Sequence, residues 1–117
     1  LNNRKEIYKL LNIPVEDILI DNPYVQTATK EHPGCQIDYM IQTRFQNIFI
    51  CEVRFQKEVI KKEIINEVKE RSQKLVTPKG FSKRSVLIHV NGVADSVVES
   101  GYFAKIIDFG DLLQPST

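Results

Sequence analysis

Long apolar runs, cysteine motifs and excess charge are all missing from this sequence. No apolar stretch approaches the roughly 20 residues of a membrane span, and no signal peptide is recognisable. Cys35 and Cys51 have neither a C-x-x-C partner nor a metal-ligand spacing with a histidine, which argues against a zinc site. A loop of the form G-x-x-x-x-G-K-[ST] is absent, so we do not expect the chain itself to be an ATPase. These absences predict a cytoplasmic protein with reduced thiols and no membrane contact.

What is present fits a single globular domain. The chain has 117 residues, 42% of them hydrophobic and 26% charged, which is enough to build a core without disulfide bonds. The formal net charge is only +1, so a nucleic-acid partner would need a local basic surface instead of a basic total. The sequence begins at Leu1 and not at methionine, and we therefore expect it to be a fragment of a longer protein.

The stretch 36–55 has the pattern of a β-hairpin. Two runs rich in β-branched and aromatic residues, 36–43 and 48–55, flank a polar break at Gln46-Asn47. A turn centred on Gln46 would place Met40 opposite Glu52 and Asp38 opposite Arg54. Alternation then predicts two faces. One carries Asp38, Met40, Gln42, Ile50, Glu52 and Arg54, and the core face carries Ile37, Tyr39, Ile41, Phe49, Cys51, Val53 and Phe55.

The first of these faces carries two carboxylates and a cation. A metal ion held between Asp38 and Glu52 would offset the cost of placing Glu52 directly after an apolar run. Arg54 would then supply positive charge for a phosphate. The alternative is a strand end that reaches solvent, with a cross-strand ion pair between Asp38 and Arg54.

Short motifs along the chain support the first interpretation. The segment G-C-Q-I-D at 34–38, followed by C-E-V-R-F at 51–55, resembles the active-site hairpin of the PD-(D/E)XK, or restriction-endonuclease-like, nucleases. It is most similar to the version at the C-terminus of a group of prokaryotic AAA-type ATPases. The segments 85–92 and 106–113 resemble the last strand-loop and the terminal segment of that domain, so the likeness covers nearly the whole chain.

The resemblance implies a site and a cofactor. Asp38 and Glu52 would hold Mg²⁺ or Mn²⁺, and Arg54 occupies the position where the family usually has a lysine that positions the attacking water. Arginine cannot act as a base, because it stays protonated, although it can stabilise negative charge on a transition state. The glutamate that the family often carries on its first helix would lie upstream of Leu1, and Glu6 is the one acidic residue on the helix expected here.

Elsewhere the pattern alternates between helix and strand. We expect a helix at 2–11 ended by Pro14, a connector at 15–20, a turn at 21–23 and a first strand at 24–30. Apolar residues at Ile60, Ile64, Val68 and Leu75 predict an amphipathic helix over 57–75. A strand at 85–90, a helical turn at 94–100, a strand at 103–107 and a tail at 114–117 complete the chain.

These elements define an α/β fold with a restriction-endonuclease-like αβββαβ core. The sheet should be mixed, with helices on both sides, because the crossover helix would make strand 85–90 parallel to the second hairpin strand. The whole of 1–117 is then one nuclease-like domain, and the resemblance makes it the C-terminal part of a longer ATPase-type protein.

Basic residues give candidates for a nucleic-acid surface. The loop 77–84 is basic and rich in glycine and proline, and Lys79, Lys83 and Arg84 are its best candidates for phosphate contacts. Lys57 would approach the scissile phosphate if the helix begins beside the metal site.

Three functions remain open. The first is a metal-dependent phosphodiesterase acting on DNA or RNA through Asp38, Glu52 and Arg54. The second is a nuclease-like module without catalysis that binds nucleic acid, DNA foremost, or a protein. The third is a domain that structurally completes an ATPase, with the acidic pair only an ion-pair cluster. Fold alone cannot choose among them, since function belongs to the site.

Overall fold

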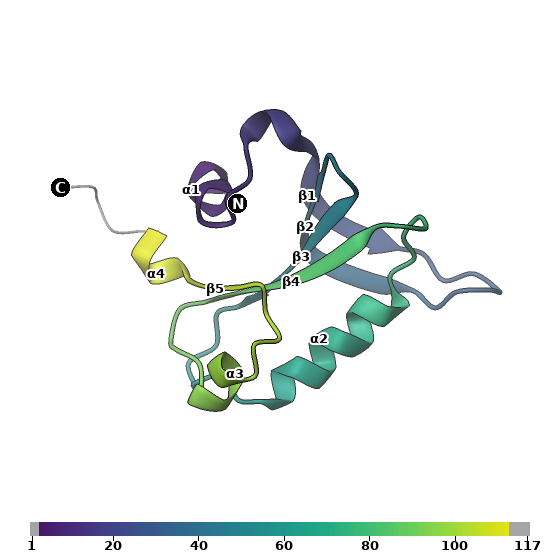
Figure 1. The fold of residues 1–117 in the computed structure, drawn as a ribbon. Helices are drawn as coiled ribbons and strands as arrows, with labels where there is room; N and C mark the ends of the chain where they lie inside the picture. The colour runs from purple at the N-terminus through teal and green to yellow at the C-terminus, as the bar shows by residue number, and fades with distance from the viewer. Residues whose placement is uncertain (1–2, 113–117) are drawn as a thin grey trace.

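Five strands and four α-helices make up the structure, a computed structural model that describes residues 3–112 (Figure 1). In chain order the elements are α1 (Arg4–Leu10), a 3-10 turn η1 (Val15–Asp17), β1 (Ile18–Gln26), β2 (Cys35–Thr43), β3 (Asn47–Arg54), α2 (Glu63–Lys74), β4 (Ser82–His89), α3 (Asp95–Glu99), β5 (Lys105–Asp108) and α4 (Phe109–Leu112). Leu113 and the expected tail at 114–117 lie outside the described residues. No described helix is long and apolar enough to cross a membrane.

The strands form one mixed sheet in the order β1-β2-β3-β4-β5. The pairs β1–β2 and β2–β3 are antiparallel, whereas β3–β4 and β4–β5 are parallel. The α2 crossover makes β4 parallel to β3, as expected from the sequence. The predicted α/β class, the αβββαβ order and the mixed sheet are therefore confirmed.

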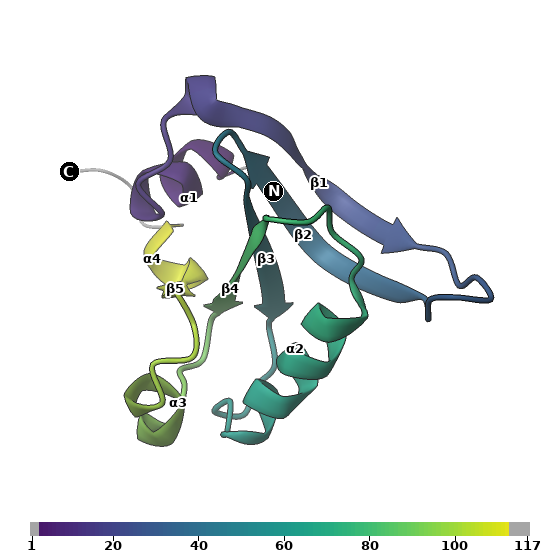
Figure 2. The same ribbon diagram turned by 45° about the vertical axis from the view of Figure 1, so that its right-hand side comes forward.

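Helices cover both faces of the sheet, with α1 on one side and α2 and α3 on the other (Figures 1 and 2). The α1 side holds a core cluster that includes Ile7, Tyr39, Cys51 and Ile88. The opposite side holds two clusters, one around Ile64, Val68 and Leu87 and one around Ile37, Met40, Ile50 and Leu75. Burial on both faces explains the continuous apolar run of β3.

The β2–β3 hairpin forms where predicted, but its register differs by two residues. Thr43 pairs with Asn47 and Met40 with Ile50, so Met40 does not face Glu52. The cause is the turn: Phe45 and Gln46 both adopt positive φ, at 67° and 63°, and centre a three-residue loop on Phe45 instead of Gln46. A two-residue shift preserves the side-chain parity of each strand.

A β-bulge in β2 changes the predicted faces. Asn22 pairs with Met40 and Tyr24 with Ile37, so the single residue Pro23 stands opposite Asp38 and Tyr39. As a result Ile37 packs in the same cluster as Met40, and not with Tyr39 as predicted.

The same bulge separates the two cysteines. Cys35 packs beside the cluster that contains Met40, and Cys51 lies in the α1-side core, so the two thiols lie on opposite faces of the sheet. Both are free thiols.

The first strand begins six residues earlier than predicted. β1 spans Ile18–Gln26, so the expected connector at 15–20 and turn at 21–23 are partly or wholly strand. Pro23 is tolerated because β1 is the edge strand, where one missing N–H donor need not break a ladder.

Helix α2 is shorter than predicted. Ile60 donates its backbone N–H to Gly92 and accepts from the N–H of Ala94, which forms a parallel bridge to the loop after β4. This pairing holds 57–62 out of the helix, which begins at Glu63. Ile60 is nonetheless 3% exposed and packs with Ile64 and Val68.

The remaining boundaries differ by a few residues. β4 begins at Ser82 instead of 85, because the N–H of Ser82 donates to the Gln46 carbonyl across the hairpin turn. β5 spans Lys105–Asp108, two residues later than predicted at its start. The helical turn expected at 94–100 is present as α3.

Polar contacts of Tyr8 and Arg4 hold α1 on the sheet. The Tyr8 hydroxyl donates to Asp21 of β1, and Arg4 forms an ion pair with the same carboxylate at 3.7 Å. Burial and the bond to Asp21 raise the pKa of Tyr8. Because α1 is only seven residues long, these contacts and the packing of Ile7 stabilise it more than its own propensity does.

Candidate functional site

Asp38 and Glu52 lie at the same end of the β2–β3 hairpin. The backbone N–H of Val53 donates to Oδ2 of Asp38 at 2.9 Å, so this carboxylate lies directly beside the Glu52–Val53 segment. Asp38 is also close enough to Cys51 to contribute, after burial, to the raised pKa of that thiol. The bulge interrupts the alternation of side chains at Asp38. The position of the Asp38 carboxylate is therefore given by these contacts and not by the alternation along the strand. The prediction that one ion spans both carboxylates stays a prediction.

Glu52 is buried at 5% exposure and is paired with two arginines. Arg54, two residues further along β3, donates from Nε to Oε2 at 2.7 Å. Arg71, which lies on α2, donates from Nη1 to Oε1. Both oxygens of Glu52 therefore accept from guanidinium groups, one on each side of the β3–α2 interface.

A second glutamate extends this network. Arg54 donates from Nη2 to Oε2 of Glu67 on α2 at 2.7 Å. We call the four side chains Glu52, Arg54, Glu67 and Arg71 the Glu52 network. Two carboxylates and two guanidiniums give it no net formal charge, which is the condition under which charges are tolerated in a buried position.

The environment of Arg54 keeps it charged. Burial alone would lower its pKa, but the hydrogen bonds and charges of Glu52 and Glu67 outweigh this effect and raise the pKa above its ordinary value. Arg54 is thus a permanent cation and cannot accept a proton from water.

The two carboxylates that the sequence predicted as metal ligands, Asp38 and Glu52, both accept hydrogen bonds from the protein itself. A hard cation needs several oxygen ligands, and both oxygens of Glu52 already accept from arginines. Among the described residues, no three His, Cys, Asp or Glu side chains come together as a possible metal site. A cation bound by Glu52 would have to share this carboxylate with Arg54 and Arg71 or displace one of them.

The four residues predicted to contact nucleic acid lie at two opposite ends of the sheet. Lys57 follows the end of β3, whereas Lys79, Lys83 and Arg84 lie at the start of β4, which pairs with the start of β3. Lys83 is also occupied, because its Nζ donates to the carbonyls of Ser72 at 2.7 Å and Leu75 at 2.8 Å at the end of α2. Lys57, Lys79 and Arg84 are exposed.

Glu6 does not join the Glu52 network. It is an exposed residue of α1 and lines a depression of about 430 Å³ between α1 and β5, together with Lys105 and Asp108. The first helix therefore contributes no carboxylate to the site from the described residues.

Sequence reasoning missed Arg71 and Glu67. The charges of α2 were expected to form a solvated face, and for Glu67, whose side chain is 52% exposed, that is mostly correct. A signal for Arg71 exists in the spacing Ile64, Val68, Arg71, Leu75, which is the i, i+4, i+7, i+11 stripe of one helix face. A cation in an apolar stripe indicates a buried carboxylate partner on the sheet.

Comparison with known proteins supports the fold. No family model and no curated protein matches the sequence. Among solved structures, the chain is similar to a repair endonuclease from Pyrococcus abyssi, with a TM-score of 0.50 and 14% identity over 90% of this chain. The chain spans 44% of the length of that endonuclease. At this identity the likeness shows the fold, which is nuclease-like.

Proposed function

We propose that this chain is a nuclease-fold domain that binds nucleic acid without cleaving it. The observation that carries the proposal is the engagement of both oxygens of Glu52 by Arg54 and Arg71. The two arginines compete with a metal ion for Glu52, a ligand that phosphodiester cleavage in this fold would need, and they place guanidinium groups at the edge of the site.

The arginines retain capacity for phosphate. A guanidinium has five N–H donors, of which Arg54 uses one for Glu52 and one for Glu67, and Arg71 uses one for Glu52. The side chains of Arg54 and Arg71 are 28% and 31% exposed. Donors left over on partly exposed arginines suit the oxygens of a phosphate backbone.

The similarity to a repair endonuclease supports nucleic acid as the partner class. DNA is the nucleic acid that we would test first as a ligand. The resemblance to C-terminal domains of AAA-type ATPases further suggests an ATPase domain as a protein partner, and this stays a prediction.

A second candidate, a Mg²⁺- or Mn²⁺-dependent nuclease, is favoured by one observation. Asp38 contacts the backbone directly beside Glu52, as a shared cation site would require. In that case a cation would replace the arginines on Glu52, and Arg54 would stabilise charge on the phosphate.

A cleavage assay separates the two candidates. Plasmid and single-stranded DNA are incubated with Mn²⁺ and the wild type, Asp38→Asn, Glu52→Gln or Arg54→Lys, and binding is measured in parallel without metal. We expect binding by the wild type and no cleavage by any of these proteins. Metal-dependent cleavage by the wild type that Asp38→Asn and Glu52→Gln abolish, and Arg54→Lys retains or increases, would establish the nuclease instead.

A further inference from the structure

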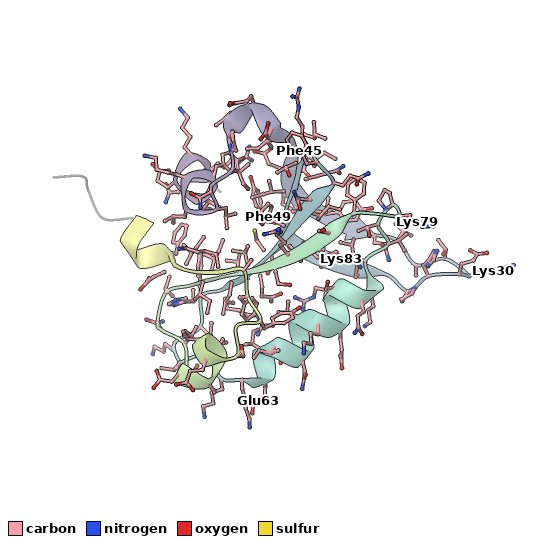
Figure 3. The ribbon with its side chains drawn as sticks, in the orientation of Figure 1. Lys30, Phe45, Phe49, Glu63, Lys79 and Lys83 are labelled. Carbon is pink, nitrogen blue, oxygen red and sulfur yellow. The ribbon has the colours of Figure 1, made fainter. Side chains whose placement is uncertain are left out.

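The tip of the β2–β3 hairpin exposes an aromatic ring to solvent. Phe45 is 80% exposed, the highest value among the exposed large apolar side chains of the described residues. It lies at the turn, apart from Phe49 in the core (Figure 3). Its φ of 67° is a conformation that costs free energy in a residue other than glycine, and asparagine or aspartate are the usual substitutes. The core gains no packing from this strained, exposed ring.

Two cations line the same depression as the ring. Arg44 and Arg84 are both exposed, and together with Phe45 they line a depression of about 220 Å³ between the hairpin turn and the segment after α1. In the part of the chain that the structure describes, neither arginine forms an ion pair. Asp17 is the one carboxylate that lines the depression.

The neighbouring loop adds a third cation. The N–H of Ser82 donates to the Gln46 carbonyl at 2.8 Å, which ties the loop between α2 and β4 to the hairpin turn. Gly80 of this loop lies against the Gln46 side chain. Lys79 is exposed and directly precedes Gly80 in this loop.

We propose that the hairpin tip binds single-stranded nucleic acid, with one base stacked on Phe45 and the adjacent phosphates bound by Arg44 and Arg84. The inference rests on the proposed function, and it names both the strand form and a contact surface separate from the Glu52 network. An aromatic ring among cations is the pattern of single-strand binding, because every base offers a flat face and every linkage a charge. In a duplex the faces of the bases are covered by their neighbours, so the ring has no partner there.

The separation from the Glu52 network follows from the strand register. Phe45 precedes the first residue of β3, whereas Arg54 is its last residue, so the length of the strand lies between the two sites. A strand of about eight residues spans roughly 26 Å.

Fluorescence anisotropy with a labelled oligo-dT of about 15 nucleotides, and with a duplex of the same length, tests the inference. Phe45→Gly is the most informative variant, because glycine accepts the positive φ and the protein should fold at least as well as the wild type. We expect Phe45→Gly to weaken oligo-dT binding about tenfold, within the range for loss of one stacked base. Phe45→Tyr should bind like the wild type, and Arg44→Ala and Arg84→Ala should bind more weakly with a reduced salt dependence.

Lys30→Ala is the matched control. Lys30 is exposed in the loop between β1 and β2, far from Phe45 in Figure 3, and its removal should leave affinity unchanged. Oligo-dT binding by Phe45→Gly equal to that of the wild type, or stronger binding of the duplex than of oligo-dT, would overturn the inference and leave the proposed function standing. A wild type that binds neither oligonucleotide at low salt would overturn both.

Discussion

At the scale of single residues, the buried carboxylate of Glu52 determines what the site can do. An unpaired charge at 5% exposure would be costly, and Arg54 and Arg71 offset that cost from opposite sides. Removing either arginine leaves the buried Glu52 carboxylate partly unpaired. Removing a solvent-exposed lysine of α2 breaks no buried ion pair.

Arg71→Ala should therefore destabilise the protein by about 1 to 3 kcal/mol, less than the roughly 3 to 5 kcal/mol for breaking a fully buried pair, because the arginine is partly exposed. Arg54→Ala should cost a similar amount. Lys74→Ala, an exposed position on the same helix, should stay within about 0.5 kcal/mol. Urea denaturation measures all three, and equal stability of Arg71→Ala and Lys74→Ala would show that Glu52 does not depend on the arginine.

A second residue-scale prediction concerns Cys51. Burial, with a smaller effect of the Asp38 charge, raises the pKa of this thiol from 9.0 to about 12. A raised pKa in the folded state means that the native protein holds the proton more tightly, so the stabilisation is complete below pH 9 and is lost between pH 9 and 12.

Between pH 9 and 11, the free energy of unfolding should fall more steeply for the wild type than for Cys51→Ala, by up to about 1.4 kcal/mol per pH unit. Comparing the slopes of the two proteins cancels other groups that titrate in this window, including Tyr8. Parallel slopes would mean that Cys51 is not shielded from solvent as its 1% exposure indicates.

At the scale of elements, the sequence was most informative where one pattern had a single physical explanation. The two β-rich runs and the apolar stripe predicted the hairpin, α2 and the parallel β3–β4 pair. Boundaries depended on long-range hydrogen bonds that local patterns do not contain, such as the bridge between Ile60 and Val93 and the bond from Ser82 to Gln46. The bulge opposite Pro23 was equally invisible, because it requires knowing that β1 pairs with β2 at that point.

The α2 side of the sheet gives an element-scale prediction. Ile60→Ala and Ile64→Ala should each cost about 2 to 5 kcal/mol, because both side chains are 3% exposed within one core cluster. Val59→Ala, next to Ile60 but 46% exposed, should change stability by less than about 0.5 kcal/mol. A loss at Ile60 no larger than that at Val59 would place Ile60 outside the core.

The candidate site likewise contains residues that a local pattern can indicate and residues that depend on long-range contacts. Asp38, Glu52 and Arg54 could be predicted to lie close together because a single hairpin joins them. Arg71 could not, since its contact with Glu52 spans 19 residues and depends on how α2 docks on the sheet. The hairpin tip was missed because the exposure of Phe45 depends on a turn whose residues carry no glycine.

At the scale of the whole molecule, the fold combines a nuclease-like architecture with a buried glutamate paired to two arginines. The αβββαβ order, the mixed sheet and the helices on both of its faces are those the resemblance implied, and the similarity to a repair endonuclease extends over 90% of the chain. The chemistry at the end of β3 follows from the Glu52 network and not from the architecture, because a fold does not fix the function of its sites.

The thermal stability of the wild type with and without Mn²⁺ tests this account most directly. Mn²⁺ at 100 times its dissociation constant would stabilise a folded site by about 2.7 kcal/mol, which corresponds to a shift in Tm of roughly 10 to 20 °C at about 4 to 8 °C per kcal/mol for a domain of this size. The account predicts that millimolar Mn²⁺ changes the Tm of the wild type no more than that of Glu52→Gln. A rise of several degrees in the wild type that is absent from both Glu52→Gln and Asp38→Asn would contradict it.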